Sequence, residues 1–116
     1  MALAINKISD VYSTAPQITP EDVAEIASLG FKSIINNRPD QEGGAEQPTS
    51  DAIKAAAEQS GLHYYHIPVI PNNIQSAEVE EFSKVYETTP KPILAFCRTG
   101  NRATRILELS QNTQNT

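Results

Sequence analysis

The sequence lacks several features that would define other classes of protein. It contains one cysteine, and no apolar run approaches the stretch of about eighteen residues that a membrane span needs. A single cysteine cannot form an internal disulfide, which agrees with a reducing compartment. Residues 1–10 lack the basic start and the long apolar stretch of a secretory signal. We therefore expect a cytoplasmic protein.

Positive charge is also scarce. The 116 residues carry 9 Lys and Arg against 14 Asp and Glu, a formal net charge of −5, and no basic stripe follows any segment. Nucleic acids and anionic membranes are therefore poor candidate partners. The exception is local, because Arg98, Arg102 and Arg105 fall within eight positions and the next acid is Glu108. This cluster indicates a small anionic substrate, while the sequence leaves the oligomeric state open.

Predicted strands alternate with predicted helices along the chain. Short apolar runs predict strands at residues 8–12, 31–36, 62–69 and 93–96, and helical signals predict helices from Thr19 to Gly30, over 49–60, from Ser76 to Pro90 and over 102–110. This alternation favours a three-layer α/β fold, with a mostly parallel central sheet of about four strands flanked by helices. We expect one domain over residues 1–110 and a polar C-terminal tail over residues 111–116.

The last predicted strand leads into the last predicted helix through Cys97-Arg98-Thr99-Gly100-Asn101-Arg102. Ligands of open α/β sheets bind beyond the carboxyl ends of the strands, where this loop and the segments 37–40 and 70–73 should lie. The unpaired N–H groups and the dipole at a helix start attract an oxyanion, and Gly100 allows the backbone to curl. Arg102 can place two hydrogen bonds on that anion. The loop is therefore a predicted anion-binding cradle.

The same surroundings act on Cys97. A helix start and nearby guanidinium groups favour the thiolate, which is the nucleophilic form of cysteine. A lone cysteine is more often an inert small hydrophobe, but the flanking arginines, the glycine and the strand-to-helix setting favour catalysis here. A non-catalytic module that binds an anion or a phosphopeptide is a further alternative.

Two families of thiolate enzymes have an active loop similar to this one. It resembles the active loop of rhodanese-type sulfurtransferases, in which four residues separate cysteine and arginine, and less closely the phosphate loop of cysteine-dependent phosphatases, in which five do. The segments Ser33-Ile34-Ile35-Asn36-Asn37-Arg38-Pro39-Asp40 and His66-Ile67-Pro68-Val69 resemble the phosphatase-like domain of beta-lactamase hydrolase-like proteins. This resemblance extends from Ile5 to about Leu109 and implies the fold of the dual-specificity phosphatases.

Two departures from the phosphatase pattern favour sulfur transfer. The loop is one residue shorter, and no aspartate follows Asp51, whereas phosphatases of this fold carry an acid after the Ile-Pro-Val strand. Sulfur transfer through a persulfide needs no strong acid, because a leaving group such as sulfite is a stable anion. We therefore expect a persulfide sulfurtransferase. The alternative is a phosphomonoester hydrolase that forms cysteinyl phosphate, with Asp40 as a displaced acid.

The remaining candidates have weaker signals. Arg98, Thr99, Gly100 and Asn101 are predicted to bind substrate through the loop, and Arg38 to order its own turn or to contact substrate. Arg105 is interpreted as a surface charge. His63 and His66 lie three apart on a predicted strand and so face opposite sides, which makes a shared metal improbable. We expect no cofactor.

Overall fold

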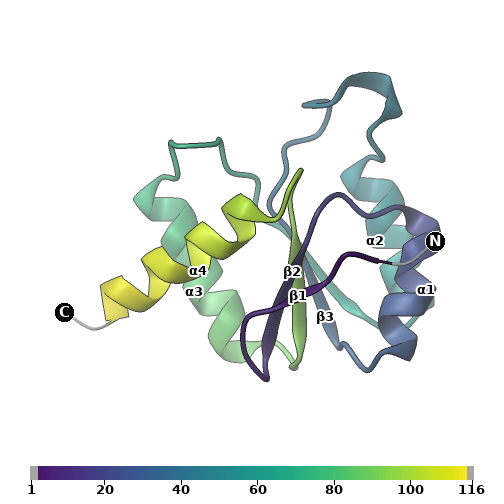
Figure 1. Ribbon diagram of the computed structural model, residues 1–116, viewed down its shortest axis with the longest axis horizontal. Coiled ribbons are helices and arrows are strands. Elements are labelled where there is room, and N and C mark those ends of the chain that lie inside the picture. The colour runs from purple at the N-terminus through teal and green to yellow at the C-terminus, as the bar shows by residue number, and fades with distance from the viewer. Residues whose placement is uncertain (1–2, 115–116) are drawn as a thin grey trace.

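The computed structural model describes residues 3–114 and shows a five-stranded sheet between two layers of helices (Figure 1). The strands are β1 (Asn6–Lys7), β2 (Tyr12–Ala15), β3 (Ser33–Asn36), β4 (His63–His66) and β5 (Ile93–Phe96). Their order across the sheet is β1-β2-β5-β3-β4. All neighbours pair in parallel except β1 with β2. The predicted α/β class and mostly parallel sheet are confirmed, with β1 as an additional short strand.

The helices cover the two faces of the sheet in pairs. They are α1 (Pro20–Ser28), α2 (Ser50–Gln59), α3 (Ser76–Thr88) and α4 (Asn101–Gln114), with a short 3-10 helix, η1, at Gly44–Glu46. Helices α1 and α2 pack together on one face, and α3 and α4 on the other (Figure 1). None of the helices within residues 3–114 combines the length and the apolar character that a membrane crossing requires.

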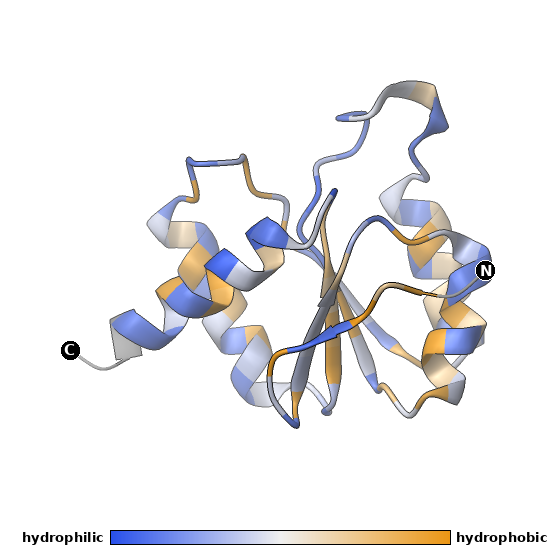
Figure 2. Cartoon of the chain, in the orientation of Figure 1, coloured by the Kyte–Doolittle hydropathy of each residue, from blue (hydrophilic) through white to orange (hydrophobic). Residues whose placement is uncertain are grey.

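The central strands β3 and β5 are buried on both faces, which explains their continuous apolar sequences. Ile34 of β3 lies beside Leu94 of β5, and both join the core under α1 and α2. Their chain neighbours Ile35 and Ala95 face the opposite core, under α3 and α4. Figure 2 shows the matching apolar sides of the helices turned toward the sheet.

Two helix starts follow the expected capping chemistry. Thr19 caps α1 in a reciprocal capping box with Asp22, and the Thr49 hydroxyl accepts a hydrogen bond from the Ala52 N–H at the start of α2. For α3 the sequence predicts a cap at Ser76, and the structure differs. Gln75, rather than Ser76, occupies the N-cap position, and its backbone N–H donates to the Glu78 carboxylate.

Both ends of the chain differ from the prediction. The strand expected at residues 8–12 is wrong, because the chain turns there and β2 starts only at Tyr12. Ser13 and Thr14 are buried although they are polar, so the apolar pattern does not mark this strand. At the other end, α4 continues to Gln114 instead of ending near Ser110, and residues 115–116 of the predicted tail lie outside the described part of the chain.

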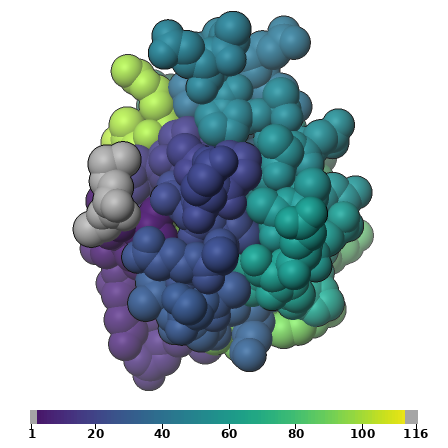
Figure 3. Space-filling view, turned by 90° about the vertical axis from the view of Figure 1, so that its right-hand side faces the viewer, coloured from purple at the N-terminus to yellow at the C-terminus, as the bar shows by residue number. Residues whose placement is uncertain are grey.

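The carboxyl ends of β3, β4 and β5 lie at one edge of the sheet, which faces upward in Figure 1. The segments that follow these strands, 37–49, 67–75 and 97–100, therefore meet there. Figure 3 shows the face covered by α1 and α2, with the segment near residues 40–48 projecting above it. This edge carries the candidate site.

Candidate active site

Cys97 follows β5 directly and is 1% exposed. Its Sγ accepts a hydrogen bond from the Gly100 N–H at 3.0 Å, so the loop curls back over the sulfur. The curl needs a left-handed residue, and Gly100 has φ +99°. The Arg98 carbonyl accepts a hydrogen bond from the Gln17 N–H, which ties the loop to the segment after β2.

The electrostatics of the loop favour the Cys97 thiolate. Burial raises the pKa of the Cys97 thiol, but hydrogen bonds from the backbone N–H groups of Ala103, Thr99, Gly100 and Arg102 outweigh it, and the pKa falls below its ordinary value. Several N–H groups thus point at one atom, which is the geometry of an anion-binding nest. The donors of the loop thus converge on the sulfur, and their binding of a substrate anion stays a prediction.

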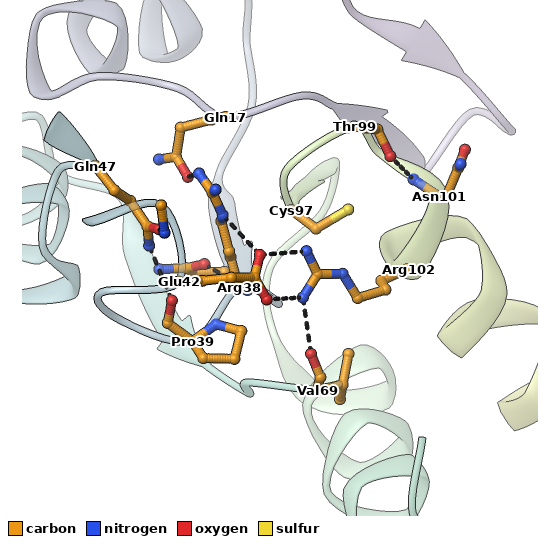
Figure 4. Close-up of polar contacts among 12 residues, drawn as sticks. Gln17, Arg38, Pro39, Glu42, Gln47, Val69, Cys97, Thr99, Asn101 and Arg102 are labelled. Atoms are coloured by element: carbon orange, nitrogen blue, oxygen red, sulfur yellow. Dashed lines mark hydrogen bonds and ion pairs between the residues drawn. The ribbon is translucent and has the colours of Figure 1, made fainter. Parts of the chain in front are cut away.

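Arg102 is buried beside Cys97 and is held by two partners (Figure 4). Its Nη1 donates to Glu42 Oε2 at 2.8 Å and to the Val69 carbonyl at 2.9 Å, while its Nη2 donates to Glu42 Oε1 at 2.7 Å. A guanidinium group has five N–H donors, so one Nη2 hydrogen and the Nε hydrogen remain. The hydrogen bonds to Glu42 raise the pKa of Arg102, and its contact with Cys97 adds to this.

Glu42 is the functional residue that the sequence did not reveal. Its carboxylate also accepts a hydrogen bond from Arg38 Nε at 2.9 Å, so one carboxylate bridges two arginines (Figure 4). The hydrogen bond from Arg102 lowers the pKa of Glu42, with a smaller contribution from Arg38, so Glu42 is ionised at neutral pH. Glu42 lies 60 positions from Arg102 in a polar loop, where no local pattern signals its role.

Arg38 is buried and belongs to the same network, and it also orders its own turn, because its backbone N–H donates to the Asn36 side chain at 2.9 Å. Its Nη1 donates to the Gln17 side chain at 3.0 Å, and its backbone carbonyl lies 2.9 Å from His66 Nε2. The guanidinium packs over Gly43, where a Cβ would lie 2.7 Å from Nη2. A side chain at position 43 would therefore push the Arg38 guanidinium out of its present place. Whether Arg38 also contacts substrate stays a prediction.

Asp40, the predicted acid, lies in the same loop as Glu42 but contacts the start of α2. It is exposed, and its Oδ1 accepts a hydrogen bond from the Ser50 N–H at 2.7 Å, at the start of α2. Gln41 has φ +68°, which turns the chain between Asp40 and Glu42. The structure thus gives Asp40 a helix-capping contact and brings Glu42 to the cysteine loop.

Two cavities open at this edge of the sheet. The smaller, about 420 Å³, is lined by Arg38, Glu42, Gly43, Pro71, Arg98 and Arg102. The larger, about 1060 Å³, continues past Arg98 and Arg102 between the segment 71–74 and α4. Thr99 and Asn101 line the larger cavity, but the Asn101 side chain points away from Cys97 (Figure 4). The hydroxyl of Thr99 accepts a hydrogen bond from the Asn101 N–H, so it organises the loop.

One class of protein typically combines a cysteine directly after a central strand, a nest of backbone N–H groups around its sulfur and a buried arginine at the start of the next helix. These features define, on this sheet, the dual-specificity and tyrosine-phosphatase-like fold. The chain belongs to the family of the phosphatase-like domain of beta-lactamase hydrolase-like proteins, which matches residues 4–114. The resemblance read from the sequence is confirmed.

Individual relatives agree with this family. The beta-lactamase hydrolase-like protein of Xylella fastidiosa (strain Temecula1) is 35% identical over 109 residues, which cover 94% of this chain and 25% of that protein. Its counterpart in Agrobacterium fabrum is 33% identical over 105 residues, covering 90% of this chain and 24% of the relative. The chain therefore spans about a quarter of the length of these curated relatives.

A solved structure supports the same conclusion. The crystal structure of a candidate phosphatase from Neisseria meningitidis has 36% sequence identity and a TM-score of 0.87, and the match covers 99% of this chain and 81% of that one. Family and neighbour thus support a phosphatase-like enzyme. They do not support the preference for sulfur transfer over phosphate hydrolysis.

Proposed function

We propose that this domain hydrolyses a phosphomonoester through a cysteinyl phosphate on Cys97. The observation that carries the proposal is the convergence of backbone N–H groups on the Cys97 sulfur, next to an arginine that has two N–H donors beyond those bound by Glu42 and Val69 and that contacts the same sulfur. These donors are arranged before substrate arrives, so they stabilise the charge that develops on the transferred group without reorganising.

The reaction would proceed in two displacements. The Cys97 thiolate attacks phosphorus, an S–P bond forms, and the P–O ester bond breaks with its electron pair leaving on oxygen. The nest and the two remaining Arg102 hydrogens bind the non-bridging oxygens. Water then attacks phosphorus, the S–P bond breaks, and inorganic phosphate leaves with the thiolate regenerated.

The acids near the site restrict the leaving group. Glu42 and Glu108 are the acidic side chains that line the two cavities, and Glu42 is held ionised by two arginines. Asp40 would first have to give up its hydrogen bond with Ser50. Neither Glu42 nor Asp40 is thus placed to protonate a strongly basic oxygen. Aryl or acyl phosphates and phosphoanhydrides, which leave as weak bases, fit this site better than alkyl phosphates.

Glu42 acts through Arg102 rather than on substrate. Its two oxygens occupy one edge of the guanidinium, and the Val69 carbonyl occupies the outer Nη1 hydrogen. A planar guanidinium held at one edge presents the opposite edge in a fixed direction. We infer that Glu42 is a positioning residue, and that its negative charge also limits the repulsion between Arg38 and Arg102.

Sulfur transfer remains the second candidate because of one specific observation. Four residues, rather than five, separate Cys97 from Arg102, and the Gly100 N–H already donates to the sulfur itself. Such a tight nest suits a persulfide. The thiolate would attack the sulfane sulfur of thiosulfate, an S–S bond would form on Cys97, and sulfite would leave with the electron pair.

One experiment separates the two reactions. The protein is incubated with an aryl phosphate or with thiosulfate, quenched rapidly in acid, and examined by intact-mass measurement. Phosphate hydrolysis predicts one phosphoryl group on Cys97, vanadate inhibition, and a loss of turnover of at least about 10⁴-fold in Cys97→Ser. An added sulfur without aryl phosphate turnover would overturn the phosphatase proposal. Retained anion affinity in Cys97→Ala, with no turnover of either substrate by the wild-type protein, would instead indicate a binding module.

A further inference from the structure

The larger cavity is a groove beside the proposed reaction centre. It runs between the segment 71–74 and the outer side of α4, and it shares Arg98, Arg102 and Pro71 with the smaller cavity. Its volume of about 1060 Å³ exceeds the 420 Å³ of the smaller cavity. A single phosphoryl group bound over Cys97 would leave this groove unused.

The groove carries positive charge that the protein compensates only in part, although Glu108 also lines it. Arg98 is exposed, and among residues 3–114 the structure gives its guanidinium no hydrogen-bond acceptor. Arg105 contacts Glu108 at 3.4 Å, with both side chains more than half exposed, so this pair is weak. Arg38 and Arg102, by contrast, share the Glu42 carboxylate. An unpaired cation, Arg98, and a weakly paired one, Arg105, thus lie on the groove side, in a chain whose formal net charge is −5.

The spacing of these cations sets the size of a ligand. Arg102 and Arg105 are three residues apart on α4, which is about 4.5 Å along the helix axis. The amides of Asn72 and Asn73 line the opposite side of the groove and can donate hydrogen bonds to anionic oxygens. A second anionic group about one helical turn from the reacting group would therefore meet Arg98 and Arg105.

We propose that the substrate is a small molecule with two phosphoryl groups, one over Cys97 and the other in this groove between Arg98 and Arg105. The identity of the reacting group rests on the proposed function, whereas binding of the second group does not require turnover. Charge confined to one helical turn suits a compact dianionic group better than an extended phosphopeptide, whose contacts would spread along the surface.

Binding to the inactive Cys97→Ser variant tests this proposal separately from catalysis. Ethylene-1,2-bisphosphonate and ethylphosphonate, which differ by one phosphonate group, are titrated by calorimetry at constant ionic strength. The bisphosphonate should bind about tenfold more tightly, as one added set of charge-assisted hydrogen bonds predicts. Adding Arg105→Gln should reduce this ratio to about threefold or less, since it removes one of the two cations.

Lys54→Gln in the same background is the matched control. Lys54 is exposed on α2, and the exchange removes the same charge far along the chain from the groove. It should leave the ratio unchanged.

Equal affinity for the two phosphonates, or an equal loss in the Lys54 and Arg105 variants, would overturn the proposal. Tighter binding of a singly phosphorylated tyrosine peptide than of the bisphosphonate would also overturn it, in favour of a peptide partner. If the ratio behaves as expected while the wild-type protein turns over no phosphate ester, the groove proposal stands and the proposed function fails.

Discussion

The loops that follow β5 and β3 meet over the same cavity, yet they contribute charge in different ways. In the loop after β5, backbone N–H groups provide the donors and converge on the Cys97 sulfur. In the loop after β3, side chains provide the charges, and Arg38 and Glu42 largely satisfy each other and Arg102. The first loop is arranged to receive an anion, and the second to hold the first in place.

The difference shows how the loop of residues 97–102 depends on residues that are distant in the sequence. The nest can form from consecutive residues because its hydrogen bonds are local. Arg102, however, has a long side chain with many rotamers, and fixing it carries an entropic cost. The Glu42 carboxylate and the Val69 carbonyl offset that cost with three hydrogen bonds. Four variants or measurements probe this division of roles.

The largest effect is expected at Arg102. Arg102→Lys keeps the charge but removes the planar fork, so it cannot bind Glu42 and substrate oxygens together. We expect kcat/KM for an aryl phosphate to fall about 10²–10³-fold, as for loss of a preorganised donor to a developing anion. Thermal unfolding of the same variant controls for a folding defect. A fall of less than about threefold would show that the backbone nest suffices.

Glu42 is expected to have the next largest effect. Glu42→Ala should lower kcat about tenfold or more with little change in KM, because it frees the Arg102 side chain without removing it. Glu42→Gln, which can still accept one hydrogen bond, should lose less. An increase in activity would contradict the positioning role, since it would mean that the carboxylate blocks the anion site.

A smaller effect than those of the Arg102 and Glu42 variants is expected for the pH at which Cys97 becomes reactive toward an alkylating agent. The lowered pKa means that the thiolate, and with it the alkylation rate, rises with pH through a midpoint below the value of about 8.5 for an ordinary cysteine. Iodoacetamide labelling followed by mass spectrometry gives this profile, with N-acetylcysteine as the reference thiol. A midpoint at or above that of the reference would show that burial raises the pKa of Cys97 more than the backbone N–H groups lower it.

The smallest effect is expected at Asp40. Asp40→Ala removes the hydrogen bond to the Ser50 N–H at the start of α2 and should lower the free energy of unfolding by about 1 kcal/mol. Thr49→Ala, at the same helix start, is a matched comparison with a similar expected loss. Denaturant unfolding measures both. If Asp40 is not the general acid, the limb of the pH–rate profile that reports an acidic group should be unchanged in Asp40→Asn. Loss of that limb in the variant would instead show that Asp40 is the general acid.

Much of the fold could be predicted because its signals are local. β5 matches the predicted residues 93–96, and α1 and α2 are capped by Thr19 and Thr49, the first residues of the ranges predicted for these helices. The first strand could not be predicted in the same way. Ser13 and Thr14 are buried by the sheet and by the loop over Cys97, not by their own hydrophobicity. The apolar residues 8–12 therefore predicted a strand in place of residues 12–15, which form β2. In the structure Ile8 is 40% exposed.

The sequence by itself determined the position of Cys97, the cradle of residues 98–102 and the arginine that follows, because these depend on neighbours within six residues. Only the tertiary structure decided which acid contacts Arg102. Asp40 and Glu42 lie two residues apart, and the left-handed Gln41 between them directs one toward α2 and the other toward Arg102. A carboxylate 60 positions from its partner has no local signature, since the pairing exists only once β3 and β5 lie side by side.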